Sequence, residues 1–219
     1  MPTDILFDLD GTLIDSSPGI LASFARVLEA NGLAPAVPLE ASLIGPPLAV
    51  TLRQVSGVRD EALLARLVDA FKADYDAEGY RATAVFPGVA AGLARLAGEG
   101  ARLFVVTNKR MAPTRKILDA LGLARHFAGI HTRDESEPPA PSKSAVTGRI
   151  VARYGIDPAR ACLVGDSDED AAAARENGIA FIRAAYGYGT AGLAGRPDAV
   201  LEDFTRLPEL LGRLRAAAT

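Results

Sequence analysis

ILFDLDGTLIDS, residues 5–16, surrounds the carboxylate of Asp8 with four apolar residues and places a second acid, Asp10, two positions later beside a glycine. A short apolar run that ends at a turn signal is typical of a buried strand. A carboxylate in such a strand costs free energy unless the molecule uses it. The stretch therefore predicts a core strand whose carboxyl end presents two acids for a chemical purpose.

The composition is that of a globular chain. The 219 residues are 49% hydrophobic, enough for one large core, or for one core and a small second domain. The net charge of −3 comes from 24 basic and 27 acidic residues that are interspersed, so no basic tract predicts nucleic-acid binding. No charge-free run approaches the roughly 20 residues of a membrane span, so we expect no membrane partner.

The N-terminus and the cysteine content indicate a reducing compartment. The start MPTD leads almost at once into a strand, without the basic and apolar segments of a signal peptide. The single cysteine, Cys162, stands in the apolar stretch ACLVG, which favours a buried thiol over a nucleophile. We therefore expect a cytoplasmic protein, either a monomer or a homodimer.

Strand-length apolar runs recur along the chain, with helical patterns between the later ones. They lie at residues 5–9, 102–106, 161–164, 180–183 and, more weakly, 199–201. Alternating strands and helices build parallel sheets with helices on both faces. The sequence predicts an α/β fold with a doubly wound, Rossmann-like parallel sheet.

Residues 16–86 interrupt this alternation, because they contain helical periodicity and no convincing strand. One helix is expected to begin at Ser17-Pro18 and to end at Gly32. A crossover between parallel strands is usually far shorter. We expect an inserted α-helical cap domain at residues 16–86 and a core domain at residues 1–15 and 87–219. The alternative is a helical decoration with no role at the site.

The ends of the predicted strands carry acids, a hydroxyl, an amide and one lysine. Ligands of open parallel sheets bind beyond the carboxyl ends of the strands. The residues at or near those ends are Asp8, Asp10, Thr107, Asn108, Asp166 and Asp170, with Lys143 at the start of a helical pattern. Three carboxylates within a few ångströms repel one another unless a cation lies among them, and hard oxygen ligands suit Mg²⁺. Magnesium beside a hydroxyl and an ammonium indicates a phosphoryl site.

Lys143 is informative because the chain has four lysines against twenty arginines. A compact ammonium fits a tight pocket that holds one phosphate and one carboxylate, where a forked guanidinium would crowd. We therefore expect Lys143 to bind phosphate.

The chain resembles the haloacid dehalogenase (HAD) superfamily over nearly its whole length. The four motifs occur in order as DLDGT at residues 8–12, VVTNK at residues 105–109, Lys143, and VGDSDED at residues 164–170. The stretches IGPPL at residues 44–48, FPGV at 86–89 and GYGT at 187–190 are similar to the phosphoglycolate phosphatase branch, whose members carry a helical cap inserted after the first motif.

The resemblance implies a role for each motif residue. Asp8 would be the nucleophile that forms an aspartyl phosphate, and Asp10 would be the general acid and base. Mg²⁺ would be held by the carboxylates of Asp8 and Asp166 and the backbone carbonyl of Asp10, with Asp170 supporting these ligands. The phosphoryl oxygens would be bound by Thr107, Asn108 and Lys143.

The resemblance implies a Mg²⁺-dependent phosphatase of small phosphorylated metabolites, with 2-phosphoglycolate the best single candidate. Asp10 favours phosphate chemistry, since a halide leaves without a proton and dehalogenase members lack this acid. A phosphosugar mutase, or a pyrophosphatase or nucleotidase of the same superfamily, remains an alternative. A non-catalytic phospho-receiver module is a more remote one, because receivers have about half this length and no comparable insertion.

Several other residues invite a functional interpretation. The cap residues Arg53, Lys72 and Arg81 could meet a substrate carboxylate, but scattered helix charges are usually solvated. His126 and His131 lack partners at metal-ligand spacing and favour packing or surface positions. The remaining candidates are Tyr186 and Tyr188, as crevice lining or loop anchors, and residues 45–48, as a stiff turn that brings backbone groups toward the substrate.

Overall fold

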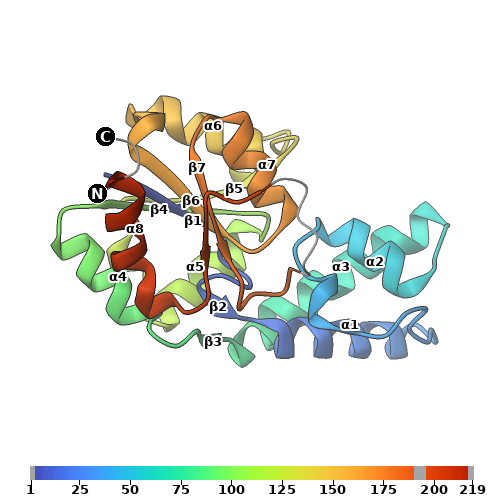
Figure 1. Cartoon of the computed structure of the whole chain (residues 1–219). Helices are drawn as coiled ribbons and strands as arrows, with labels where there is room; N and C mark the ends of the chain where they lie inside the picture. The colour runs from blue at the N-terminus through green and yellow to red at the C-terminus, as the bar shows by residue number, and fades with distance from the viewer. Residues whose placement is uncertain (1–2, 190–195, 217–219) are drawn as a thin grey trace.

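The computed structural model describes residues 3–189 and 196–216, and its centre is a six-stranded parallel sheet (Figure 1). The strand order is β5-β4-β1-β6-β7-β8. The strands are β1 (Asp4–Phe7), β4 (Arg102–Thr107), β5 (Gly129–Thr132), β6 (Ala161–Gly165), β7 (Ala180–Ala184) and β8 (Ala199–Leu201). Neighbours pair in parallel throughout. The predicted doubly wound α/β fold is confirmed.

Helices cover both faces of the sheet. They are α4 (Val89–Gly98), α5 (Met111–Ala120), α6 (Lys143–Tyr154), α7 (Asp168–Glu176) and α8 (Leu207–Ala216). Within β1, Ile5 and Phe7 pack toward α4, α5 and α8, whereas Leu6 packs toward α6 and α7. Successive side chains of a strand point to opposite faces, so a strand covered on both sides is apolar at every position. This explains the apolar run before Asp8.

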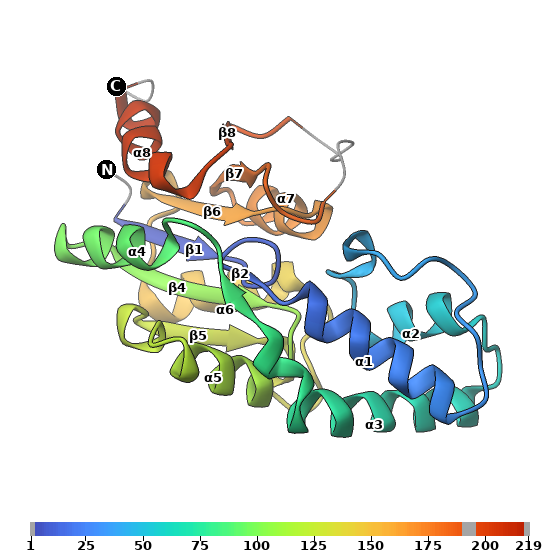
Figure 2. The same ribbon diagram turned by 90° about the horizontal axis from the view of Figure 1, so that it is seen from below.

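The long interruption folds as a separate helical layer beyond the carboxyl end of the sheet (Figure 2). It contains α1 (Ser17–Ala30), α2 (Leu48–Ser56) and α3 (Glu61–Ala77). These helices share their own apolar cluster, in which Phe24, Leu52 and Phe71 are buried. The inserted helical domain is thus present, and its bounds at residues 16–86 stay a prediction. None of the described helices is long and apolar enough to cross a membrane.

A short antiparallel ribbon connects the helical layer to the sheet, and here one prediction is wrong. We expected no strand within residues 16–86, but β3 (Ala84–Val85) pairs with β2 (Ile14–Asp15). Two residues are too few to show a period of two, so the pattern of residues could not reveal this strand. Both connections between the core and the cap run through this ribbon.

The first strand ends earlier than predicted, at Phe7 rather than Leu9. The backbone N–H of Asp8 still donates to Val164 O at 2.9 Å, after which the chain turns, and Leu9 O accepts from the N–H groups of Leu13 and Ile14. Asp8 therefore stands at the last position that the sheet holds, where its side chain faces the cap.

Candidate active site

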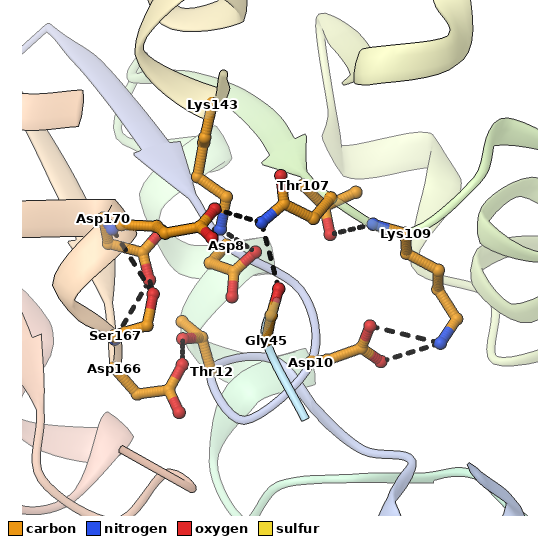
Figure 3. A network of polar contacts seen from close by, with 12 residues as sticks. Asp8, Asp10, Thr12, Gly45, Thr107, Lys109, Lys143, Asp166, Ser167 and Asp170 are labelled. Carbon is orange, nitrogen blue, oxygen red and sulfur yellow. Dashed lines mark hydrogen bonds and ion pairs between the residues drawn. The ribbon is translucent and has the colours of Figure 1, made fainter. Parts of the chain in front are cut away.

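Four charged side chains from separate stretches of the chain meet at the carboxyl end of the sheet (Figure 3). Asp8 follows β1, Asp166 follows β6, Lys143 opens α6 and Asp170 lies in the first turn of α7. β1 and β6 are neighbours in the sheet, so their ends lie side by side. The parallel topology thus brings together residues that are up to 162 positions apart, as Asp8 and Asp170 are.

Lys143 bridges two carboxylates at the centre of this group. Its Nζ lies 2.8 Å from Oδ1 of Asp8 and 2.8 Å from Oδ1 of Asp170, and its side chain is 3% exposed. Burial lowers the pKa of Lys143, but Asp170 and Asp8 outweigh burial and raise the pKa above its ordinary value. The ammonium is therefore charged, and it neutralises only part of the surrounding negative charge.

The remaining negative charge fits a hard divalent cation. One oxygen each of Asp8, Asp166 and Asp170 lies within 4.8 Å of the others, and all three residues are buried. Burial and the neighbouring acids raise the pKa of Asp8 well above its usual value, although Lys143 opposes the shift. Burial, followed by the charge of Asp170, raises the pKa of Asp166 to about 6. A cation among these oxygens would relieve the repulsion, and carboxylates are ligands that Mg²⁺ prefers.

Two of these acids are fixed by their neighbours. Asp170 accepts hydrogen bonds from the N–H and Oγ of Ser167 at 3.1 and 2.5 Å, which caps α7. Asp166 accepts from Thr12 Oγ1 at 3.2 Å and from the N–H groups of Tyr188 and Gly189 at 2.7 and 3.1 Å. Donors around carboxylate ligands orient them in metal sites.

Gly11 is required where the chain turns directly after the two acids of the first motif. Its φ is +82°, a conformation that favours glycine, and a Cβ at this position would collide with the carboxylate of Asp166. The turn therefore places the backbone after Asp10 directly against Asp166.

Asp10 lies apart from the other acids, on the side that faces the cap (Figure 3). Both of its oxygens accept from Nζ of Lys109, at 3.0 and 3.1 Å, and Oδ1 also accepts from Ser16 Oγ at 2.5 Å. No role is predicted for Lys109 from the sequence, although this residue is the last of the VVTNK motif. Two features of the sequence could have indicated it, because Lys109 is one of only four lysines and follows the end of a predicted strand.

The other two predicted phosphate ligands lie at the end of β4. Thr107 is 2% exposed, and its Oγ1 accepts from the N–H of Lys109 at 3.2 Å. Asn108 donates from Nδ2 to Gly45 O at 3.0 Å and also contacts Glu169. Gly45 belongs to the predicted stiff turn, so this turn does bring a backbone carbonyl to the site.

A cavity of about 100 Å³ separates the core from the cap. The core side contributes polar residues, which are Asp8, Asp10, Thr107, Asn108, Lys109, Arg110 and Lys143. The cap side contributes mostly apolar residues, among them Ile20, Phe24, Leu43, Leu48, Phe71 and Tyr75. Asp166 does not line this cavity, and its carboxylate is bound by the loop at Tyr188.

The cap cations singled out from the sequence lie elsewhere. Arg53, Lys72 and Arg81 do not line the cavity, and each pairs on the surface with a nearby acid of the cap, Glu61, Asp69 and Glu78 respectively. The interpretation as solvated helix charges is therefore the correct one.

The histidines are likewise remote from the cavity. His131 is buried in β5, where Nδ1 lies 2.8 Å from Glu135 Oε2 and Nε2 lies 3.2 Å from the hydroxyl of Tyr154. Cys162 is buried in β6, and burial raises the pKa of its thiol to about 12. His131 and Cys162 are buried and His126 is half-buried, which agrees with the predicted packing or surface positions.

The two tyrosines of the GYGT region anchor their loop. Tyr186 donates its hydroxyl to Thr12 O at 2.8 Å, and Tyr188 donates to Asp15 Oδ1 at 2.7 Å. The hydroxyl of Tyr188 also accepts from the N–H groups of Ser16 and Ser17 at 2.8 and 3.1 Å. The last residue of that stretch, Thr190, lies outside the described residues.

Comparison with known proteins is consistent with this geometry. The chain is 37% identical to the tyrosine-protein kinase PtkA of Mycobacterium tuberculosis over 194 residues, which cover 87% of the chain and 64% of that protein. It is also 37% identical to the plasmid-encoded phosphoglycolate phosphatase of Cupriavidus necator over 229 residues, 98% of the chain and 95% of that protein.

Solved structures match over almost the whole chain. A haloacid dehalogenase-like family hydrolase from Streptococcus pneumoniae superposes with a TM-score of 0.82 at 28% identity, covering 96% of this chain and 97% of that one. The structure of PtkA gives a TM-score of 0.81 at 33% identity, with 96% and 98% covered. The model of the haloacid dehalogenase-like hydrolase family matches residues 5–184. The chain belongs to the haloacid dehalogenase-like hydrolase family.

Proposed function

We propose that the protein is a Mg²⁺-dependent phosphatase of small phosphate monoesters, with 2-phosphoglycolate as the best candidate substrate. The observation that carries this proposal is the convergence of Asp8, Lys143 and Asp166 at the sheet end, with the second acid, Asp10, at the adjoining cavity. We further propose that the protein acts in the cytoplasm.

Asp8 is the nucleophile in this proposal. Its Oδ2 has no hydrogen-bond partner among the described side chains, whereas Oδ1 is held by Lys143 at 2.8 Å. The free oxygen attacks phosphorus, the ester P–O bond breaks, and an aspartyl phosphate forms as the alcohol leaves. Water then attacks this phosphorus, which frees Asp8 and inorganic phosphate and so divides one difficult displacement into two.

Asp10 moves the protons. It gives a proton to the leaving alkoxide in the first step and takes one from the attacking water in the second. The carboxylate must turn from Lys109 toward Asp8 to do this. Asp10 is only two residues after Asp8 and precedes Gly11, whose positive φ turns the chain at this point.

The other site residues would bind either the metal or the phosphoryl group. Mg²⁺ would be held by the carboxylates of Asp8 and Asp166 and the backbone carbonyl of Asp10, and it would neutralise charge on the phosphoryl group. Lys143, Thr107 and Asn108 would bind phosphoryl oxygens in a site that the cap screens from water. Asp170 would hold Lys143 in place, since its Oδ1 accepts from Nζ at 2.8 Å.

The cavity and the relatives support a small substrate. A volume of about 100 Å³ between core and cap admits a metabolite of a few carbon atoms. The relative from Cupriavidus necator, which the chain covers almost completely, is a phosphoglycolate phosphatase.

The test is a panel of phosphate monoesters, sugar phosphates, nucleotides and pyrophosphate, with and without Mg²⁺, on the wild type and on Asp8→Asn. We expect Mg²⁺-dependent release of phosphate, highest with 2-phosphoglycolate and absent in Asp8→Asn. Highest turnover on pyrophosphate or a nucleotide would instead identify a pyrophosphatase or a nucleotidase of the same family. Exchange of phosphate between two phosphorylated sugars would identify a mutase. Phosphorylation of Asp8 without any turnover would favour the receiver.

A second candidate is phosphoryl transfer to tyrosine, because PtkA is 37% identical and is a tyrosine-protein kinase. The same core residues could pass a phosphoryl group from Asp8 to a phenol instead of to water. Incubation with labelled ATP and a tyrosine peptide separates the two functions. Label on the peptide supports the kinase, whereas label only in inorganic phosphate supports the phosphatase.

A further inference from the structure

We propose that Lys109 and Tyr75 form a receptor for a second anionic group of the substrate, a carboxylate, and that this carboxylate displaces Asp10 from Lys109. The inference rests on the proposed phosphatase function and names the substrate class of the same site. It adds a specificity device in which recognition of the carboxylate releases the general acid.

Lys109 is a buried ammonium whose counter-ion is a residue that the reaction needs elsewhere. Its side chain is 7% exposed, and Nζ lies 3.0 and 3.1 Å from the two oxygens of Asp10. Nζ also lies 4.7 Å from the ring centroid of Tyr75, over its face. Removing its carboxylate partner from a buried ammonium is costly, so Asp10 leaves readily only if another anion takes its place.

Tyr75 supplies a hydroxyl at the same point. The residue is 2% exposed and lines the cavity, and its hydroxyl lies beside Lys109 and Thr83 without forming a hydrogen bond of ordinary geometry among the described residues. Burial raises the pKa of Tyr75, so the hydroxyl stays protonated and can donate. A buried hydroxyl without a partner costs free energy that a bound ligand would recover. A carboxylate has two acceptor oxygens, one for Lys109 and one for Tyr75.

The other cationic side chains of the cavity wall already form ion pairs with carboxylates. Arg110 binds Asp76 of α3 through two hydrogen bonds, at 2.6 and 2.9 Å. Lys143 is held between Asp8 and Asp170. Among the described residues that line the cavity, Lys109 is therefore the cation whose partner has to move for the reaction to proceed.

The exchange couples recognition to catalysis. An incoming carboxylate replaces the carboxylate of Asp10 at Lys109, so the buried charge of the pair is unchanged. Asp10 then keeps only the hydrogen bond from Ser16, takes up from water the proton that it later donates, and can turn toward the leaving oxygen. An ester without the second anion leaves Asp10 on Lys109 and reacts slowly. Binding energy from the non-reacting end of the substrate is thereby used in the transition state.

The test compares 2-phosphoglycolate with ethyl phosphate, which has the same chain length and no carboxylate. The readout is the ratio of the two kcat/KM values. We expect this ratio to fall about 10²-fold in Lys109→Met, with kcat on ethyl phosphate rising because Asp10 is released. In Tyr75→Phe, which keeps the ring, we expect a fall of about 10-fold.

Lys116→Met is the matched control. Lys116 also reaches from core to cap, donating to Asp76 O at 3.0 Å, but it does not line the cavity. We expect its ratio to equal that of the wild type. An equal loss on both esters in Lys109→Met would mean that Lys109 only supports the fold, and would overturn the proposal. Tyr75→Phe keeps the proposal testable if Lys109→Met does not fold.

A binding measurement separates this proposal from the proposed function. Calorimetric titration of Asp8→Asn and of Asp8→Asn with Lys109→Met uses 2-phosphoglycolate and inorganic phosphate as probes. We expect Lys109→Met to weaken 2-phosphoglycolate at least about 10-fold more than phosphate. If Lys109→Met weakens 2-phosphoglycolate selectively but the wild type shows no turnover, the carboxylate receptor is supported and the phosphatase function is contradicted. If the wild type turns over substrate but Lys109→Met weakens both probes equally, the phosphatase function is supported and the carboxylate receptor is contradicted.

Discussion

The two walls of the cavity are built on opposite principles. The core wall presents charged and polar groups at the ends of sheet strands, such as Asp8 and Thr107, and each is held by its own hydrogen bonds to core residues. The cap wall presents side chains such as Phe24 and Phe71, whose rings lie 4.6 Å apart between centroids in a separate apolar cluster. The core wall therefore carries the proposed chemistry, whereas the cap wall excludes water and limits the size of the substrate.

The two buried lysines mark the same division. Lys143 lies within the core and binds two carboxylates that belong to the core, Asp8 and Asp170. Lys109 lies at the boundary, between Asp10 of the core and the ring of Tyr75 in the cap. A change near Lys143 should therefore affect every substrate, whereas a change near Lys109 should affect substrates selectively.

The largest expected effect is at the core wall, in Asp8→Asn. The amide cannot act as the nucleophile, so we expect kcat to fall at least about 10⁴-fold on every ester. Release of inorganic phosphate with saturating Mg²⁺ measures this. Unchanged circular dichroism controls for folding, and activity within tenfold of the wild type would contradict the assignment of Asp8.

The next effect is in Asp10→Asn, which removes the proton donor and keeps the shape. With alkyl esters we expect kcat to fall about 10²–10⁴-fold, because the alkoxide then leaves without a proton. With an aryl ester such as p-nitrophenyl phosphate the loss should be smaller, since that leaving group needs little protonation. Equal losses on both kinds of ester would show that Asp10 does not act as the acid.

A smaller effect concerns Mg²⁺ and pH. The pKa of Asp166 is raised to about 6 without metal, so in the folded protein its carboxylate is charged above that pH and protonated below it. The raised value also means that the metal-free protein loses stability as pH rises from about 4 to 6, where the folded state still binds a proton that the unfolded state has released. Mg²⁺ should therefore raise Tm more at pH 7.5 than at pH 5.

The affinity for Mg²⁺ should fall at least about tenfold for each pH unit below 6, since binding must displace the proton of Asp166 and, because the pKa of Asp8 is also raised, that of Asp8. Calorimetric titration measures this, with Asp166→Asn as the control that reduces the dependence. The same rise in Tm at both pH values would argue against a metal held by Asp166.

The smallest effect is expected on the outer surface of the cap, in Arg53→Gln. The Arg53 side chain is 46% exposed and pairs with Glu61, which is 76% exposed, so the pair is largely screened by solvent. We expect kcat/KM for 2-phosphoglycolate to change less than about twofold, and Tm to change little. A selective loss on carboxylate-bearing esters would instead mean that Arg53 reaches the substrate when the cap moves, and would weaken the distinction between inner and outer cap surfaces.

Local signals in the sequence predict five of the six sheet strands, all but β5, and the residues at the carboxyl edge of the sheet. Apolar runs such as residues 102–106 are local signals, and in a parallel sheet the ends of the strands meet whatever the details of packing. The convergence of Asp8, Asp166 and Lys143 therefore follows from the sequence pattern alone. The strand β3 could not be predicted, because its two residues are too few to show a strand period.

The groups of the cap that face the cavity could not be predicted from the sequence. Arg53, Lys72 and Tyr75 all lie on cap helices, but only Tyr75 lines the cavity, since this depends on the angle at which the helical layer packs on the core. The pairing of Lys109 with Asp10 arose in the same way, because a buried ion pair joins residues 99 positions apart and leaves no trace in local pattern. Periodicity records which side of a helix is buried, and it does not record which partner the buried side meets.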